Sequence, residues 1–266
     1  DIFIEVSHGP TLIDNNILLS DCSCRISAQG IAFVHNLING SFTWVGEGVW
    51  NGGDKIPTPR YTPYHVPHRT EINGFMTIQH GDVRFYNNIF VQKSIRSVLL
   101  KYAKEKCVSE INKLNFICGT KPYDGYPSSE KYFSQFDKTN YNIKKERDKY
   151  YDHMPIYTGG NVYCNGAQPY DGEKDFVVIN EKVFISIVNE EEKYILRTNL
   201  FDLIPNMKIS VISTETLGEA FEPEQKFENP DGTPIIFNTD YFGKHRRITP
   251  KVGPFESDEE LKRTLV

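Results

Sequence analysis

Three short segments near the start of the chain repeat one pattern of hydrophobic and polar positions. Each places an asparagine just before a pair of apolar residues. The three copies are Ile13–Leu18, Phe33–Ile38 and Phe85–Phe90. Their asparagines are at positions 16, 36 and 88, so the spacings are 20 and 52 residues. Short strands that recur about every twenty residues are typical of a solenoid. The pattern therefore predicts coils of a parallel β-helix, with an insertion between the second and third copies.

The asparagines give this prediction a physical basis. A stacked coil needs a tight turn at one corner, where asparagine tolerates the left-handed backbone conformation. Stacked side-chain amides can also hydrogen-bond to one another along the axis of the solenoid. We therefore expect Asn16, Asn36 and Asn88 to occupy left-handed corners and to contact one another. With only three copies, a generic sheet protein without repeating coils stays open as an alternative.

The segment between the second and third copies, Gly40–Asp82, is rich in residues that interrupt regular structure. Its glycines and prolines include Gly46, Gly48, Gly52, Gly53, Pro57, Pro59, Pro63 and Pro67. This density favours an irregular loop, and a long loop in a compact protein is more often functional than idle. We therefore predict an active-site loop at 40–82, within the C-terminal coils of a β-helix at residues 1–92.

Residues 93–155 differ in composition from the segment before them. Between Ser94 and Leu114 the apolar positions have helical spacing, with lysine and glutamate elsewhere. A second charged, tyrosine-rich stretch, Glu130–Tyr151, is also a candidate helix. This block is predicted to be a helical insertion or lid that packs against the solenoid.

Residues 156–266 return to a pattern typical of strands. The apolar runs are Phe176–Ile179, Val183–Val188, Tyr194–Arg197 and Met207–Ile212. Short, evenly spaced strands separated by polar turns favour a small β-sandwich. The remainder, from Gly243, is expected to wrap over the surface. The predicted fold class is thus mainly β, a partial right-handed parallel β-helix with a helical insertion and a C-terminal β-sandwich.

Composition and charge narrow the classes of function. With 266 residues, 39% of them hydrophobic and 24% charged, the chain is long and apolar enough to be globular. A net charge of −5 argues against nucleic acid as the main partner, because neutralised phosphates supply most of such binding. No run of about 18 apolar residues occurs, so no membrane-spanning helix is expected.

The cysteines carry little functional information. There are five, an odd number, and none form a C-x-x-C pair. Their density is too low for a disulfide scaffold. We therefore expect reduced thiols that act as small hydrophobic residues of the core, which favours the cytoplasm as the compartment.

Glu5 is the first candidate for chemistry. In Phe3–Val6 it alternates with apolar residues, as on a β-strand, and His8–Pro10 follows as a sharp, polar bend. Adjacent coils of a solenoid lie about 4.8 Å apart. Carboxylates at matching positions would thus be about 5 Å apart, which is the separation found in retaining glycosidases. A partner for Glu5 would then belong to a coil before Asp1. The alternative is an exposed carboxylate without a catalytic role.

A second group of candidates lies in the long loop. His65, His68 and Glu71 form the pattern H-x-x-H-x-x-E, which resembles a set of three metal ligands. Pro63 and Pro67 oppose the helix that would place these side chains on one face. A polar loop that hydrogen-bonds sugar hydroxyls is the favoured interpretation, and a purely structural loop is the other.

Aromatic side chains in the same loop also suit a carbohydrate. Trp44 and Trp50 could each stack on a sugar ring or cap the core of the solenoid. Aromatic residues make up 13% of the chain, which suits the surfaces of β-sheets as well as sugar binding. No dinucleotide-binding fingerprint, P-loop or G-x-S-x-G motif is present.

Several of these segments together resemble glycoside hydrolase family 120. These are β-xylosidases built on a right-handed parallel β-helix that is accompanied by a β-sandwich domain. The resemblance is carried by Phe3–Pro10, Ile13–Ser20, Pro59–His65 and Arg84–Phe90, within residues 1–92. Gly159–Pro254 is less specifically similar to the closing segments of the family, and the charged block between them has no counterpart.

The resemblance implies a retaining exo-glycosidase that releases xylose from the non-reducing ends of xylo-oligosaccharides. It implies Glu5 as the acid/base and an aspartate nucleophile about one coil upstream, supplied by a companion chain or an upstream segment. This chain alone is then expected to be inactive. No cofactor and no metal are expected. The residues expected to bind the sugar are His8, His35, Trp44, Arg60, His65, His68 and Glu71.

Two other functions stay open at this point. One is a different β-helix carbohydrate enzyme, either a polysaccharide lyase or an inverting hydrolase. A lyase usually needs a basic or metal-assisted site for its uronate, whereas this chain is acidic. The other is a solenoid that binds sugar, or supports structure, without catalysis.

Overall fold

Three parallel sheets form the centre of the protein. The computed structural model describes residues 2–44, 61–94, 117–136, 153–191 and 193–256. The first sheet contains β1 (Ile2–Glu5), β4 (Cys22–Ser27) and β7 (Ser41–Trp44). The second contains β2 (Thr11–Asp14), β5 (Gln29–Val34), β10 (Gly81–Tyr86) and β12 (Ile156–Gly159). The third contains β3 (Ile17–Leu18), β6 (Leu37–Asn39), β11 (Ile89–Val91), β13 (Asn161–Cys164) and β14 (Phe176–Ile179). The fold is therefore mainly β, as the sequence predicted.

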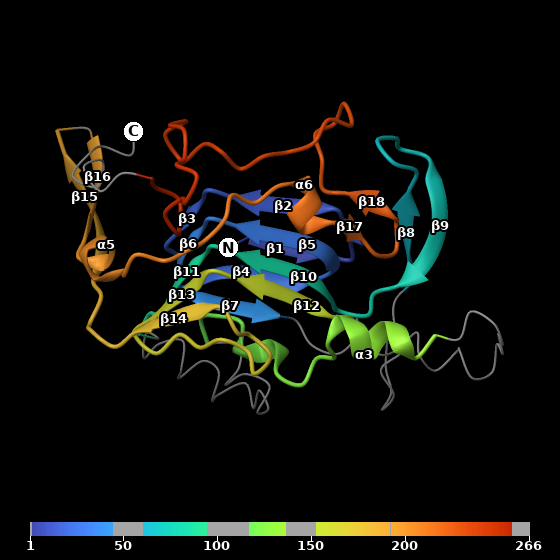
Figure 1. Cartoon of the computed structure of the whole chain (residues 1–266), viewed down its shortest axis with the longest axis horizontal. Coiled ribbons are helices and arrows are strands. Elements are labelled where there is room, and N and C mark those ends of the chain that lie inside the picture. Colours follow the sequence, from blue (N-terminus) through green and yellow to red (C-terminus); the bar gives the residue numbers. More distant parts are fainter. Residues whose placement is uncertain (1, 45–60, 95–116, 137–152, 192, 257–266) are drawn as a thin grey trace.

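The chain passes through the three sheets in turn. β1, β2 and β3 form one coil, β4, β5 and β6 form the next, and each strand pairs in parallel with its counterpart (Figure 1). Ile13 is paired with Phe33, and Phe33 with Phe85. The three repeats recognised in the sequence thus occupy equivalent positions. We call these layered coils the stack.

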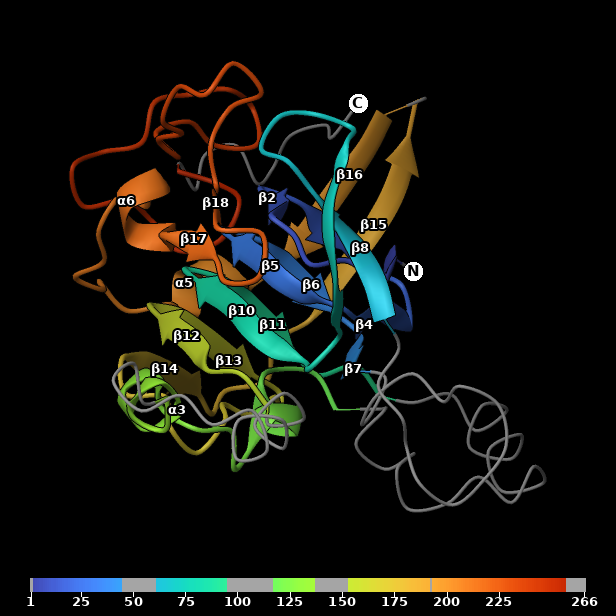
Figure 2. The ribbon, with the colours of Figure 1, turned by 90° about the vertical axis from the view of Figure 1, so that its right-hand side faces the viewer.

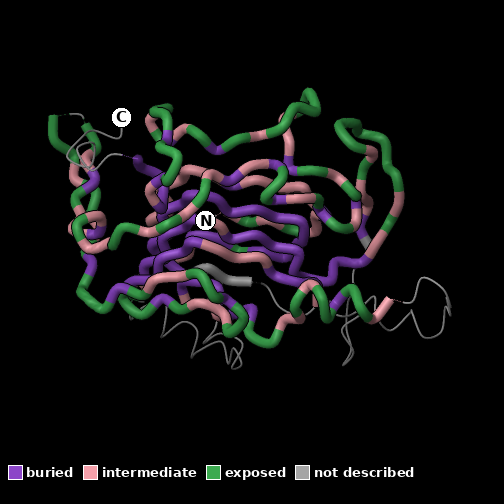
Figure 3. Tube along the Cα trace, in the orientation of Figure 1, coloured by how far each residue is buried: buried purple, intermediate pink, exposed green. Residues whose placement is uncertain are grey.

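Apolar residues at equivalent positions fill the interior of the stack. The rings of Phe33 and Phe85 are stacked at 5.3 Å between centroids, and Phe90 and Tyr163 are stacked at the same distance. Figure 3 shows that the strands of the stack are buried, whereas the loops around them are largely exposed. The sequence repeat places like side chains one above another, and their burial stabilises the stack by the hydrophobic effect.

A ladder of asparagine side chains runs along one corner of the stack. The backbone N–H of Asn16 donates to Oδ1 of Asn36 at 3.0 Å, and that of Asn36 to Oδ1 of Asn88 at 3.0 Å. The N–H of Asn88 donates to Oδ1 of Asn161 at 2.9 Å. The ladder ends at Glu173, whose Oε1 accepts from Nδ2 of Asn161 at 2.8 Å. The predicted contacts among the asparagines are confirmed, and Asn161 adds a fourth copy.

The left-handed corner residue is the one before each ladder asparagine. Positive φ angles occur at Asn15 (54°), His35 (56°), Asn87 (57°) and Gly160 (68°). The prediction that the ladder asparagines themselves are left-handed is therefore wrong. The physical reason is that consecutive residues have different roles. The residue with positive φ turns the chain, and the asparagine after it donates its backbone N–H along the axis of the stack.

The long segment between the second and third coils contains regular structure. β8 (Tyr61–His65) and β9 (Ile72–Thr77) form an antiparallel hairpin, which stands beside the stack in Figure 1 and faces the viewer in Figure 2. The expectation of an irregular loop is wrong for these residues. Pro63 is accommodated because, among the described strands, β8 pairs only with β9, and an edge strand tolerates proline.

The predicted helical insertion is described only in part. The first candidate helix lies outside the described residues, except for Ser94. The second overlaps α3 (Ser129–Ser134), which Ser128 caps by accepting a hydrogen bond from the Lys131 N–H. A 3₁₀ helix, Lys121–Tyr123, precedes it. Tyr123 and Tyr132 of these two helices are buried against the rest of the protein.

The C-terminal part does not form the predicted β-sandwich in the described residues. β12, β13 and β14 instead extend the parallel sheets, because Val83 pairs with Ile156 and Ile89 with Val162. β15 (Ile185–Glu190) and β16 (Lys193–Thr198) form a two-stranded antiparallel arm. The predicted strand Met207–Ile212 is not a strand in the structure.

After this arm, short elements join long connecting segments over the stack. They are α5 (Leu200–Leu203), α6 (Thr214–Leu217), β17 (Glu219–Ala220) and β18 (Gln225–Lys226). β17 and β18 form a small antiparallel pair. Figure 1 shows this part crossing over the edge of the stack where β2 lies. Leu217 and Ala220 are buried there with Ala32 and Val34 of β5.

Two expectations of the sequence concern the core and the membrane. Cys24, Cys118 and Cys164 are free and buried, as expected, and Cys22 is free and half-buried. Cys107 lies outside the described residues. Within the described ranges, no helix has the length and apolar character needed to cross a membrane.

Candidate functional site

Glu5 ends an edge strand of the stack. Ile2 and Ile4 pack against the core, whereas Phe3 and Glu5 are exposed on the opposite side of β1. The predicted alternation is therefore confirmed. The guanidinium of Arg25 lies over the ring of Phe3 at 4.5 Å, beside the paired residues Glu5 and Ser27. Glu5 is thus presented at the end of the stack rather than within its interior.

A tight turn follows Glu5 and is held by the next coil. The N–H of Val6 donates to the Ser27 carbonyl at 2.8 Å, and the N–H of Gln29 donates to the Ser7 carbonyl at 3.0 Å. Gly9 (φ 79°) lies directly against Gly30 (φ 66°). A Cβ on Gly30 would be 2.2 Å from the His8 carbonyl oxygen. Only glycine leaves room for this approach of the two backbones, so the turn packs directly against the backbone of the next coil.

The β8–β9 hairpin forms the other wall of the turn. Nε2 of His8 lies 3.1 Å from the Thr62 carbonyl oxygen, and the Thr62 hydroxyl donates to the Val6 carbonyl at 3.1 Å. The ring of Tyr64 meets the ring of His8 edge to face, with centroids 5.8 Å apart. Tyr64 also covers Gly74 across the hairpin. The segment after Glu5 is therefore fixed from two directions.

A pocket of about 620 Å³ opens between this turn, the hairpin and the C-terminal segment. Its volume is within the usual range for small-molecule sites. The turn contributes Val6–Pro10, the hairpin contributes Thr62–Val66 and His68–Thr70, and the C-terminal segment contributes Gln225, Lys226, Glu228 and Pro230. Three of the predicted sugar-binding residues, His8, His65 and His68, line the pocket.

The three residues of the H-x-x-H-x-x-E pattern have separate partners. Nδ1 of His65 lies 3.1 Å from the Thr70 carbonyl, and Nε2 of His68 lies 2.7 Å from Oε1 of Glu228. Glu71 pairs with Arg69 and does not line the pocket. The hairpin spreads these side chains, as the prolines suggested. Within the part of the chain that is described, no three His, Cys, Asp or Glu side chains are grouped to hold a metal.

His8 is part of the frame of the pocket. It is buried, and burial lowers its pKa despite the carbonyls of Thr62 and Met76, which raise it. Besides the contact with Thr62, Nδ1 of His8 lies 2.9 Å from Nε2 of Gln29. Both ring nitrogens are therefore engaged by the protein. A direct hydrogen bond from His8 to a sugar would require one of these contacts to break.

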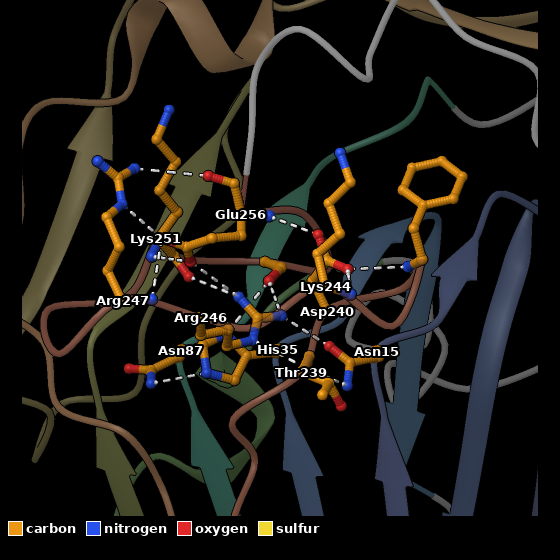
Figure 4. Close-up of polar contacts among 12 residues, drawn as sticks. Asn15, His35, Asn87, Thr239, Asp240, Lys244, Arg246, Arg247, Lys251 and Glu256 are labelled. Carbon is orange, nitrogen blue, oxygen red and sulfur yellow. Dashed lines mark hydrogen bonds and ion pairs between the residues drawn. The ribbon is translucent and has the colours of Figure 1, made fainter.

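His35 lies elsewhere and belongs to the scaffold. Its Nδ1 is 3.1 Å from the Gly253 carbonyl, and its Nε2 is 3.2 Å from Nδ2 of Asn87 (Figure 4). His35 is fully buried, and this burial, together with the nearby Arg246, holds its pKa well below the ordinary value. The expectation that His35 binds the sugar is corrected, because its left-handed corner faces the C-terminal segment.

Arg246 fastens that C-terminal segment to the corners of the stack. Its guanidinium donates to Oδ1 of Asn15 at 2.7 Å and to the Gly253 carbonyl at 3.0 Å (Figure 4). The carboxylate of Glu256 lies 3.6 Å away. The same C-terminal part of the chain contributes Gln225, Lys226, Glu228 and Pro230 to the pocket.

Two other predicted residues cannot be placed at the pocket. Trp44 is the last residue of β7, and its side chain is outside what the structure describes. Arg60 lies outside the described residues. Both remain candidates on the sequence alone.

Several residues that line or support the pocket were not predicted from the sequence. Gln29 had a signal, because it is a polar residue next to a glycine at the start of an apolar strand. Gln225 and Glu228 had no such signal, because each contacts a hairpin residue 160 positions away in the sequence. Nε2 of Gln225 donates to the His65 carbonyl at 2.5 Å.

Comparisons with known proteins connect this arrangement with a sugar-bound protein. No protein-family model matches the chain, and no curated protein matches it. Among solved structures, the complex of XylC with xylose is similar, with a TM-score of 0.76 and 30% sequence identity. The similarity covers 96% of this chain and 35% of the XylC chain. The chain thus spans about a third of the length of that protein.

Proposed function

We propose that the chain is part of a retaining exo-glycosidase, a β-xylosidase of glycoside hydrolase family 120. Its substrate would be the non-reducing end of a xylo-oligosaccharide. The observation that carries the proposal is the similarity to XylC, whose structure was solved with xylose, at 30% identity over 96% of the chain. Two segments that resemble family 120, Phe3–Pro10 and Arg84–Phe90, lie in the stack or in the turn after Glu5. The sequence resemblance and the structural similarity therefore concern the same part of the chain.

The stack is proposed to belong to a longer right-handed parallel β-helix. β1, β2 and β3 are edge strands of their sheets and belong to the same coil. The ladder supports a coil beyond them, because each asparagine Oδ1 accepts from the asparagine before it. Oδ1 of Asn16 accepts no hydrogen bond from any described residue. A companion chain or upstream segment with a matching asparagine would complete the ladder and cover the edges.

Such a coil would bring a second carboxylate to Glu5. Neighbouring strands lie about 4.8 Å apart, so a residue opposite Glu5 would have its carboxylate about 5 Å away. A retaining mechanism needs this separation, with an aspartate that attacks the anomeric carbon and forms the glycosyl-enzyme. Glu5 first donates its proton to the leaving oxygen. As a carboxylate it then takes a proton from the water that hydrolyses the intermediate.

The pocket beside the turn is proposed to hold part of the sugar. His65 and His68 line it and present ring nitrogens that can bond to hydroxyl groups, while Tyr64 offers an aromatic surface. His8 shapes the wall of this pocket through its contacts with Gln29 and Thr62. Trp44, Arg60 and Glu71 are retained as candidates for closing the pocket, on the basis of the sequence.

The proposal is tested with the chain assembled with its companion segment. We expect hydrolysis of xylobiose with retention of configuration, and a loss of about 10²–10⁴-fold in kcat/KM for Glu5→Gln, the usual contribution of a general acid/base. Aryl xylosides with good leaving groups need less acid assistance, so they should lose less. Azide should restore turnover of such substrates in Glu5→Gln and yield a β-xylosyl azide.

Glu181→Gln is a suitable control because Glu181 is exposed and does not line the pocket. It should keep kcat/KM within about two-fold. Release of an unsaturated uronate, or full activity of Glu5→Gln on xylobiose, would contradict the proposal. Absence of any glycosidase activity in the assembled wild-type protein would contradict it as well.

A further inference from the structure

Gln29 lies at the junction of the turn, the hairpin and the stack. It is the first residue of β5 and is completely buried. Its backbone N–H donates to the Ser7 carbonyl at 3.0 Å. Its side-chain Nε2 lies 2.9 Å from Nδ1 of His8, and its Oε1 accepts from the backbone N–H of Gln79 at 2.8 Å. A single amide therefore connects three segments that are distant in sequence.

The contacts of Gln29 determine which nitrogen of His8 carries the hydrogen. A backbone N–H can only donate, so the atom of Gln29 that faces Gln79 must be the carbonyl oxygen. The atom that faces His8 is then the NH₂ group, which can only donate. Nδ1 of His8 must accept, and the ring hydrogen resides on Nε2, where it donates to the Thr62 carbonyl. These hydrogen bonds are satisfied by a neutral His8 ring that carries its hydrogen on Nε2.

The same network is anchored at its far side. The Tyr132 hydroxyl of α3 donates to Oε1 of the Gln79 side chain at 3.1 Å. Gln79 and Tyr132 are both buried. Gln79 lies two residues after the end of β9 and is thus joined by the chain to the hairpin wall. The orientation of the Gln29 amide is therefore set by the backbone N–H of Gln79, whose position is fixed by packing, and not by a side chain that could rotate.

We propose that Gln29 is a positioning residue for Glu5. It fixes His8 as the neutral Nε2–H tautomer and thereby holds the turn that follows Glu5 against the hairpin. The role assigned to Glu5 rests on the proposed function, whereas the tautomer of His8 does not. A neutral His8 also keeps a cation out of the turn next to the proton donor.

Other ionisable groups surround this turn and must be considered in any pH measurement. The hairpin contributes His65, His68 and Arg69, and the C-terminal segment contributes Lys226 and Glu228, all lining the same pocket. Tyr64 meets the His8 ring at its edge. None of these groups supplies a hydrogen bond to the His8 ring, whose contacts are with Gln29 and with main chain. Gln29 is therefore the side chain whose replacement should change His8.

The first test is a spectroscopic measurement on the wild-type protein. Long-range ¹H–¹⁵N correlation spectra distinguish the two neutral tautomers and the imidazolium, and the chain has only seven histidines to assign. We expect the Nε2–H tautomer of His8 at pH 7, and a neutral ring at pH 6.5, near the ordinary pKa of histidine. An Nδ1–H tautomer, or an imidazolium at pH 6.5, would overturn the proposal without any variant.

The second test replaces the donor that faces His8. In Gln29→Glu one carboxylate oxygen still accepts from Gln79, but the other faces Nδ1, so His8 should take up a second proton and titrate at higher pH than in the wild type. Gln168→Glu introduces the same charge at an exposed residue and should leave His8 unchanged. An unchanged titration of His8 in a folded Gln29→Glu variant would overturn the proposal.

The third test measures turnover of an aryl xyloside by the assembled protein. A misplacement of about 1 Å can cost about 10²-fold in rate, so Gln29→Glu should lose roughly 10- to 100-fold in kcat, with a changed acid limb of the pH profile. Gln168→Glu should keep both. If the tautomer is as stated but Gln29→Glu keeps full kcat, Gln29 does not position Glu5. An inactive wild-type protein would instead refute the proposed function and leave the tautomer result intact.

Discussion

The asparagine ladder provides a quantitative test of the stack. Asn88 lies in its middle and is completely buried. Its Oδ1 accepts from the backbone N–H of Asn36 at 3.0 Å and from the Asn36 amide at 2.9 Å. Its Nδ2 donates to the Phe33 carbonyl at 2.9 Å and to Oδ1 of Asn161 at 3.2 Å. Asn88→Ala removes all four of these hydrogen bonds.

The expected cost follows from the groups left without a partner. The backbone N–H of Asn36 and one hydrogen of its side-chain amide lose their acceptor in a buried site. The Phe33 carbonyl also loses a donor, but its strand is paired on both sides, and Oδ1 of Asn161 keeps the Asn88 N–H. A buried polar group left unpaired costs about 1–3 kcal/mol. Two unpaired groups near the lower end of this range, together with the hydrogen bond that the Phe33 carbonyl loses, give a loss of about 3–5 kcal/mol in the free energy of unfolding.

Asn16 supplies a matched control at the end of the same ladder. It is only half-buried, and its Oδ1 accepts nothing from the described residues. Asn16→Ala deprives the Asp14 carbonyl of a donor, but Oδ1 of Asn36 keeps the backbone N–H of Asn16. We expect a loss of about 1 kcal/mol for this variant.

Urea unfolding followed by far-ultraviolet circular dichroism measures both variants, with free energies taken by linear extrapolation. The difference between them should be about 2–4 kcal/mol, with similar slopes. Equal losses for the two variants, or a loss below about 1 kcal/mol for Asn88→Ala, would refute the idea that the ladder is a buried, directional network.

Two further predictions concern a buried carboxyl and a tight contact between coils. Burial, and to a lesser extent the carboxylate of Asp82, raises the pKa of Glu222 to about 7. The unfolded chain releases this proton at lower pH than the folded protein does. The contribution of Glu222 to the free energy of unfolding therefore falls as pH rises from about 4.5 to 7, by roughly 3 kcal/mol in total. Glu222→Gln should therefore stabilise the protein at pH 8 but not at pH 4. Glu215→Gln, at an exposed residue, is the control, and parallel changes in both variants would exclude this cause. Gly30→Ala should destabilise by at least about 2 kcal/mol more than Gly218→Ala in urea unfolding, since both residues have nearly equal positive φ but only the Gly30 Cβ would meet backbone, at 2.2 Å. Equal effects would mean that the Gly30–His8 contact relaxes without cost.

Part of the fold could be predicted because it depends on a local repeat. The pattern of an asparagine before an apolar pair recurs in each coil, and stacking makes each copy support the next. The fourth copy, at Asn161, escaped because Gly160 replaces the polar corner residue and a separation of 73 residues from Asn88 hides the period. Pro63 suggested a break, yet an edge strand with one neighbour accepts it.

The sequence by itself determined the stacked coils and the exposed direction of Glu5, since both follow from the alternation and period of neighbouring residues. It also identified His8, His65 and His68, which line the pocket. Only the tertiary structure decided that His35 belongs to the scaffold, that Glu228 approaches His68, and that Gln29 sets the state of His8. The physical reason is that these contacts join segments far apart in the chain, and a hydrogen bond depends on distance and direction in space, which no local pattern of residues encodes.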